Sequence, residues 1–302
     1  MSRCRSEAGR GLSRVEQVNT LAGLVRLGEA FLAQKGIPDA CVACELLAAR
    51  LCRCGKGELH RFLDTAPETR VVDALRRGLQ RVAGGEPVQY VLGQWDFRSL
   101  TLGVDKRALI PRPETEQLVD LVLRSEVARN TPRPLVVDVG TGSGCIILSL
   151  AAEMRDGVFV GLDVSPDALA LAQENAARCG LAGRVLFAES DGCGEFDPAS
   201  VDILVSNPPY IASAAVDRLP PHIRNHEPRL ALDGGADGLE VFRAFVLDAL
   251  MVLKPGGELF FEIADDQGAA MRDLLEGHGF ADVRILKDYA EADRFATARQ
   301  SV

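Results

Sequence analysis

The ten residues from Leu135 to Gly144, LVVDVGTGSG, carry the strongest indication of the fold of this chain. Leu135 to Val139 is apolar except for Asp138, which is typical of a buried strand. Glycines follow at alternate positions, and an apolar helical pattern begins at Ile146. Glycines in such a turn let a ligand approach the backbone and leave the N–H groups of the next helix facing it. The stretch therefore predicts the first strand, turn and helix of an α/β domain with a ligand at the turn.

Strand and helix patterns alternate through the rest of the chain. The predicted strands cover residues 135–139, 158–162, 185–187, 201–205, 258–263, 283–286 and 295–298. The main helices are predicted at residues 114–124, 146–152, 239–253 and 267–277, with another around residues 168–172. This spacing predicts a doubly wound, seven-stranded and mostly parallel sheet.

The first part of the chain has a different pattern. Apolar residues recur at helical spacing from Val15 to about Ala83, and glycines end the last helix, which predicts a small helical bundle. Trp95 to Phe97 and Leu100 to Leu102 are short strand candidates that predict a hairpin. We therefore expect a disordered tail at residues 1–14, a helical domain at 15–86, a hairpin linker at 87–112 and the α/β domain at 113–302.

Composition narrows the function classes. The 302 residues carry a net charge of −9, which argues against tight nucleic-acid binding because duplex-binding proteins present basic surfaces. No apolar run approaches the ~18 residues of a membrane span, and no apolar segment of a signal peptide follows the first arginines. We expect a cytoplasmic monomer without membrane contact or a stable nucleic-acid partner.

Metal binding is not expected. Cys41, Cys44, Cys52 and Cys54 lie close together, but their spacing matches no standard zinc framework, and two of them fall within a helical pattern. Buried small apolar residues are the favoured interpretation. His222 and His226 have a helical metal-ligand spacing, yet prolines bracket them and no third ligand follows.

The glycine turn has three candidate ligands. A dinucleotide fingerprint needs G-x-G-x-x-G, and a P-loop needs a following Gly-Lys-Ser/Thr; the chain has neither. S-adenosylmethionine has no phosphates and carries a sulfonium cation, which suits a glycine turn backed by Asp138. Asp163, at the end of the second strand, is placed to accept hydrogen bonds from two ribose hydroxyls. S-adenosylmethionine is favoured because only it also accounts for the motif that follows the fourth strand.

That motif is Ser206-Asn207-Pro208-Pro209-Tyr210, at the carboxyl end of the strand at residues 201–205. The prolines stiffen the turn and lack N–H groups, so it presents oxygen acceptors. Asn207 Oδ1 and the Pro208 carbonyl can each accept one N–H of a planar –NH2 group, while Tyr210 packs on it. The nitrogen lone pair is then freed for in-line methyl transfer without a dedicated base. A proline-stiffened loop without chemistry is the alternative.

With these residues in hand, the chain resembles the protein-(glutamine-N5) methyltransferases of peptide chain release factors, the PrmC/HemK family. The resemblance covers nearly the whole chain from about Val15. The matching segments beyond Asn-Pro-Pro-Tyr are residues 87–93, PVQYVLG; 109–116, LIPRPETE; 227–228, EP; 232–235, LDGG; and 237–239, DGL. Asn-Pro-Pro-Tyr alone is shared with adenine N6 and guanine N2 methyltransferases of nucleic acids, which are the alternative function.

The resemblance implies a Rossmann-like class I methyltransferase that modifies the glutamine of the Gly-Gly-Gln motif of class 1 release factors, docked by the helical domain. It implies the following binding residues: Gly140, Thr141, Gly142, Ser143, Gly144, Asp163, Gly192 and Asn207 for S-adenosylmethionine, and Asn207, Pro208, Pro209 and Tyr210 for the glutamine. Gly192 stands where family members often carry a larger side chain beside the adenine. Glu262-Ile263-Ala264 replaces the usual Glu-Ile-Gly.

Overall fold

The computed structural model describes residues 20–301, which form two compact units that divide between Gly93 and Gln94. The expected tail at residues 1–14 lies outside the described residues. Among the described residues, every helix is too short or too polar to span a bilayer. The boundaries expected at residues 86 and 112 stay predictions.

The first unit is helical, as the spacing of its apolar residues predicts. Its elements are α2 (Leu21–Gln34), α3 (Ala40–Cys52), the 3-10 helix η2 (Lys56–Arg61), α4 (Thr69–Ala83) and α5 (Val88–Leu92). They enclose a core that includes Leu32, Leu47 and Leu75. Cys44 belongs to this core: its thiol is buried, donates to the Val25 carbonyl at 3.2 Å, and has its pKa raised by burial to about 12.

The second unit is built on two sheets. A two-stranded hairpin pairs β1 (Gln94–Phe97) with β2 (Leu100–Gly103). The main sheet contains β3 (Leu135–Val139), β4 (Val158–Asp163), β5 (Val185–Glu189), β6 (Val201–Ser206), β7 (Leu253–Glu262), β8 (Ala281–Lys287) and β9 (Asp293–Arg299). Its order is β5-β4-β3-β6-β7-β9-β8, parallel except for the antiparallel β9. The predicted seven-stranded, mostly parallel sheet is confirmed.

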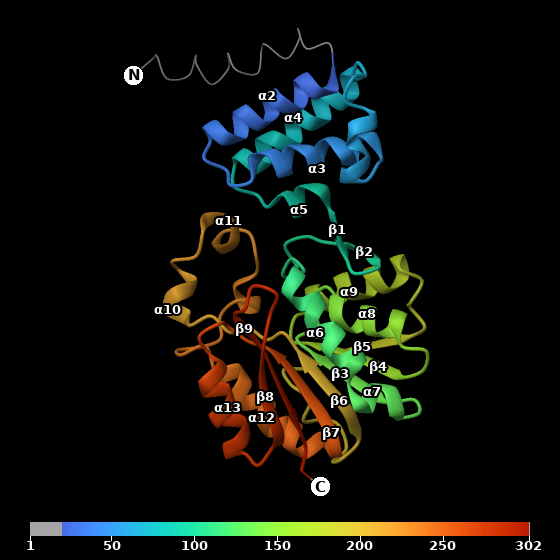
Figure 1. Cartoon of the computed structure of the whole chain (residues 1–302), viewed down its shortest axis with the longest axis vertical. Coiled ribbons are helices and arrows are strands. Elements are labelled where there is room, and N and C mark those ends of the chain that lie inside the picture. The colour runs from blue at the N-terminus through green and yellow to red at the C-terminus, as the bar shows by residue number, and fades with distance from the viewer. Residues whose placement is uncertain (1–19, 302) are drawn as a thin grey trace. The chain divides into compact units, whose positions relative to one another are not determined.

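Side chains that alternate along the strands create a core on each face of the main sheet. Val136 packs with α6 (Pro113–Arg124), α8 (Cys145–Glu153) and α9 (Pro166–Arg178), while Val137 packs on the opposite face with α12 (Glu240–Val252) and α13 (Gly268–Gly277). Figure 1 shows these helices on the two sides of the sheet. The short elements α7 (Glu126–Asn130), α10 (Ser213–Val216), α11 (Pro221–Arg224) and η3 (Arg229–Ala231) complete the unit.

The topology fixes where a ligand can bind. From β3 the chain builds outward through β4 to β5, then returns to add β6 and β7 on the other side of β3. The carboxyl ends of β3 and β6 thus flank the point where the strand order reverses, which is the usual binding crevice of open α/β sheets. The glycine turn follows β3 and Asn207 follows β6, so both lie at this crevice.

One short helix of the structure had no counterpart among the predicted elements. Residues 88–92, which precede the hairpin, form the helical turn α5. Pro87 precedes its first residue, and Gly93, with φ 68°, ends it. A proline before a helix and a left-handed glycine after it are helix-boundary signals, and they outweighed the β-branched residues between them.

Candidate active site

A cavity of about 250 Å³ opens at the carboxyl end of the sheet in the second unit. Its walls come from segments that are distant in sequence: the turn after β3, the end of β4, the segments after β5 and β6, and residues 107–115. The residues with predicted roles that line it are Gly140, Thr141, Gly142, Ser143, Asp163, Asn207 and Pro209. The structure therefore brings the glycine turn, the acidic strand end and the Asn-Pro-Pro-Tyr motif to one cavity.

The glycine turn depends on left-handed backbone. Gly140, Gly142 and Gly144 have φ values of 73°, 57° and 81°. A Cβ added to Gly140 would meet no heavy atom of a non-neighbouring residue within 4 Å, so it would project into open space at the cavity wall. Gly144 does not line the cavity; it is the N-cap residue of α8.

Asp138 supports the turn from below. Its side chain is fully buried, and Thr141 Oγ1 donates to its Oδ2 at 2.6 Å. Burial raises the pKa of Asp138 to about 7, against the Thr141 hydrogen bond that lowers it. Asp138 therefore stabilises the turn through Thr141 and does not itself face the cavity.

Asp163 joins the glycine turn to the second strand. Its Oδ2 accepts from the Gly142 N–H at 2.8 Å and its Oδ1 from the Ser165 N–H at 2.9 Å. Burial raises the pKa of this carboxyl group, and these backbone hydrogen bonds act in the opposite direction. Each oxygen keeps a second lone pair, so the carboxylate at the cavity wall can still accept hydrogen bonds from a ligand.

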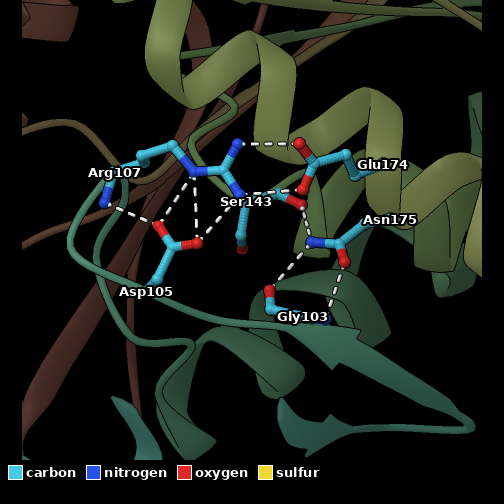
Figure 2. A network of polar contacts seen from close by, with 6 residues as sticks. All are labelled: Gly103, Asp105, Arg107, Ser143, Glu174 and Asn175. Carbon is cyan, nitrogen blue, oxygen red and sulfur yellow. Dashed lines mark hydrogen bonds and ion pairs between the residues drawn. The ribbon is translucent and has the colours of Figure 1, made fainter. Parts of the chain in front are cut away.

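A polar network links the glycine turn to the hairpin (Figure 2). The Asn175 amide on α9 donates to the Gly103 carbonyl at 3.0 Å and to the Ser143 carbonyl at 2.9 Å, and its Oδ1 accepts from the Gly103 N–H at 2.6 Å. Beside it, Arg107 binds Asp105 and Glu174 at 2.8 Å each. This one buried amide therefore positions the glycine turn against β2.

The Asn-Pro-Pro-Tyr motif is anchored at both ends. Ser206 Oγ donates to the Val139 carbonyl at 2.5 Å, and the Tyr210 carbonyl accepts from Gln267 Nε2 at 3.0 Å. Asn207 and Pro209 line the cavity, whereas Pro208 and Tyr210 do not contribute to its wall. The Tyr210 ring packs against the core on the α12 face, and burial raises its pKa to about 12.

Residues 109–116 take a larger part in the site than their sequence indicated. Arg112 lines the cavity and binds Glu227 at 2.6 Å, and the second oxygen of this buried carboxylate accepts from the Ile110 N–H. Thr115 bonds both Asn207 and the buried Glu262. No local sequence pattern indicates these contacts, because the partners lie more than 90 positions away.

Gly192 has a structural reason for its small size. A Cβ there would come within 2.3 Å of Asp248 Oδ2, the oxygen that accepts from the backbone N–H groups of Cys193 and Gly194. Gly192 does not line the cavity; the preceding Ser190 and Asp191 do. These two residues, which the sequence did not single out, are the ones that face a ligand.

Comparison with known proteins identifies the family. The model of the PrmC N-terminal domain matches residues 24–93, and the model of the methyltransferase small domain matches residues 121–221. The release factor glutamine methyltransferase of Moorella thermoacetica is 40% identical over 89% of this chain and 95% of its own length. The chain belongs to the release factor glutamine methyltransferase family. The member from Chlorobaculum tepidum is 37% identical over 92% of this chain and 97% of its own.

Solved structures support the same fold for this member of the family. A methyltransferase from Pyrococcus furiosus superposes with a TM-score of 0.50 at 17% identity, over 67% of this chain and 90% of that one. The hMettl16 catalytic domain in complex with a MAT2A 3′UTR hairpin gives 0.54 at 15% identity, over 80% and 84%. At these identities the likeness establishes the class I methyltransferase fold alone.

S-adenosylmethionine is the cofactor of this family of enzymes, and the cavity fits it. The open space beside Gly140 leaves room for a ligand against the backbone, and Asp163 offers carboxylate lone pairs to hydroxyl donors. Apolar side chains, including Val164 and Ile146, contribute most of the remaining wall. Such a site suits a ligand with one polar end, a ribose and a flat aromatic base.

Proposed function

We propose that the chain transfers the methyl group of S-adenosylmethionine to the side-chain amide nitrogen (N5) of the glutamine in the Gly-Gly-Gln motif of class 1 peptide chain release factors. The observation that carries this proposal is the position of Asn207. It lines the same cavity as the glycine turn and Asp163, and within the described residues its Oδ1 accepts no hydrogen bond. A free amide oxygen at the cavity is what an incoming –NH2 group requires.

The chemistry needs an activated nitrogen. The lone pair of a carboxamide nitrogen is delocalised, which makes the nitrogen a poor nucleophile. Asn207 Oδ1 and the Pro208 carbonyl each accept one N–H of the substrate, which orients the nitrogen and draws it towards tetrahedral geometry. S-adenosylmethionine, when bound, supplies the electrophilic methyl carbon, and the electron pair of the broken methyl–sulfur bond stays on its sulfur. The methylated nitrogen is strongly acidic and loses its proton to water, so positioning and electrostatics supply the catalysis.

The remaining predicted residues divide between contact and support. Thr141, Ser143 and the glycines of the turn hold the cofactor with Asp163, and Gly144 supports them by starting α8. Gly192 supports the adenine end through the backbone beside Asp191. Pro209 and Tyr210 complete the glutamine site of this proposal.

The partner is a protein. In this proposal the helical unit docks the release factor, and the α/β unit receives the glutamine.

The enzyme acts as a monomer in the cytoplasm, where release factors work, without a stable nucleic-acid partner. Light scattering of the purified chain tests the monomer, and an observed dimer would contradict it.

The test is methyl transfer from labelled S-adenosylmethionine to a release factor, read by mass spectrometry at the Gly-Gly-Gln glutamine. Asn207→Ala should keep cofactor affinity and lose turnover by about 100-fold or more, because it removes one preorganised acceptor. Asn225→Ala, which truncates an exposed asparagine, is the matched control. Label that enters RNA or DNA and not the factor would overturn the proposal in favour of a nucleic-acid amine methyltransferase.

A further inference from the structure

Asn207 can accept a hydrogen bond from the substrate only if its amide is oriented with Oδ1 towards the cavity. The two ends of a carboxamide have the same shape, so steric fit alone does not choose between presenting oxygen or nitrogen to the cavity. In the structure Asn207 Nδ2 donates to Thr115 Oγ1 at 3.2 Å. The oxygen therefore faces away from Thr115 and is left for a ligand.

Thr115 makes this choice because of its second partner. It occupies the third position of α6, is 2% exposed, and donates its hydroxyl proton to Glu262 Oε2 at 2.7 Å. A threonine hydroxyl has one proton. While that proton points to Glu262, Thr115 can only accept from Asn207, and Asn207 must present its nitrogen to it.

Glu262 sets the direction of the whole chain of hydrogen bonds. It is the last residue of β7, and it is 1% exposed. An ionised carboxylate only accepts hydrogen bonds, so it draws the Thr115 proton towards itself. A protonated carboxyl group can instead donate to Thr115, whose own proton is then free to bond Asn207 Oδ1 and occupy the acceptor.

We propose that Glu262 and Thr115 are positioning residues that act in series, Glu262 orienting the Thr115 hydroxyl and Thr115 orienting the Asn207 amide so that its oxygen faces the substrate. The link to glutamine methylation rests on the proposed function. The hydrogen-bond series itself does not depend on the identity of the acceptor.

The surroundings of Glu262 move the pKa of its carboxyl group into the neutral pH range. Burial raises the pKa of Glu262 to about 7, opposed by the Thr115 hydrogen bond and the charge of Arg294. The titratable and charged groups that face it come from the start of α6, from α8, from the segment after β6 and from β9: Arg112, Glu114, Cys145, Tyr210 and Arg294. Ionisation, and with it the productive amide orientation, is therefore gained as pH rises through about 7.

The first experiment needs no substrate. In full-length protein labelled with 15N-asparagine, the side-chain resonances of Asn207, assigned by their loss in Asn207→Ala, are followed from about pH 5.5 to about pH 8.5. They should titrate with a midpoint near 7 in the wild type and in Thr115→Ser, and not in Glu262→Gln or Thr115→Val. A flat wild-type curve, or a titration that persists in either of the last two variants, overturns the series.

The second experiment measures turnover on a release factor. Thr115→Val should lower kcat on the order of 10- to 100-fold with little change in the KM for S-adenosylmethionine, and Thr115→Ser should restore most of it. Glu262→Gln should flatten the rise of kcat with pH. An unchanged kcat in Thr115→Val contradicts the proposal.

Two controls separate the possible failures. Ser149→Ala removes another buried hydroxyl that donates at 2.8 Å, to the Cys145 carbonyl, and reports the cost of losing such a bond without altering Asn207. Thermal unfolding identifies any variant that fails to fold. In that case the resonance titration and the kcat of Thr115→Ser, which keeps the hydroxyl, test the proposal. If the wild type methylates no release factor, the proposed function fails. The resonance titration still tests the hydrogen bonds that run from Glu262 through Thr115 to Asn207.

Discussion

Gly140 and Gly180 allow the effect of a side chain on backbone strain to be distinguished from its effect on the space available to a ligand. Their φ values are 73° and 72°, and a Cβ at either would meet no heavy atom of a non-neighbouring residue within 4 Å. Gly140 lines the cavity, whereas Gly180 lies in the turn after α9. A side chain therefore has the same backbone cost at both sites but obstructs the cavity at only one.

Gly140→Ala should bind S-adenosylmethionine at least ~10-fold more weakly than the wild type, because its Cβ occupies space beside the cofactor. Gly180→Ala is the matched control. Both variants should lose about 1 kcal/mol of stability from the left-handed backbone, and only the first should lose affinity in titration calorimetry. Equal affinity in the two variants would place the cofactor away from Gly140.

The hairpin of β1 and β2 makes polar contacts with helices of the second unit at both of its ends. At its turn, the Arg98 guanidinium binds Asp120 on α6 and Glu153 on α8, and the Arg98 backbone N–H donates to Glu116 Oε1. At its far end, Gly103 is bonded twice by Asn175. The hairpin is therefore held by polar contacts to α6, α8 and α9.

Asn175→Ala should destabilise the protein by about 3 kcal/mol, because it leaves the buried backbone groups of Gly103 and Ser143 without partners. The unfolding midpoint should fall by roughly 10 °C. Glu174→Gln, at the exposed end of the same network in Figure 2, should leave the midpoint nearly unchanged. If both variants behave alike in calorimetry, the buried amide is not what holds the glycine turn to β2.

At the scale of the whole molecule, each unit has its own hydrophobic core. One core draws only on residues 21–92, and the two cores of the α/β unit lie within residues 97–298. A unit that buries its own core can fold alone. Since all the lining residues of the cavity lie between Arg107 and Phe245, cofactor binding should also be a property of the second unit.

The fragment of residues 94–302 should therefore fold and bind S-adenosylmethionine with near wild-type affinity. It should lose at least ~10-fold in kcat/KM on an intact release factor, because the proposed docking unit is missing. A short peptide that carries Gly-Gly-Gln cannot use that unit, so both proteins should methylate it equally. Undiminished activity of the fragment on the intact factor would remove the docking role of the helices.

Local patterns in the sequence were sufficient to predict most elements and the part of the site that each contributes. Apolar runs of strand length, a glycine turn and a proline-stiffened turn act over a few residues, so β3, β6, the turn from Gly140 and the position of Asn207 could all be predicted. The hairpin and the helical unit followed from patterns of the same range. The short helix α5 was not predicted, although Pro87 and Gly93 at its two ends are helix-boundary signals.

Which side chains contact one another across the site depends on the folding of the whole unit. Thr115 and Glu262 are separated by 147 positions, and Arg112 and Glu227 by 115. The strand order, which returns past β3 to place β6 and β7 beside α6, brings such residues together. No local pattern contains that information, because these hydrogen bonds join elements that become neighbours only in the folded sheet.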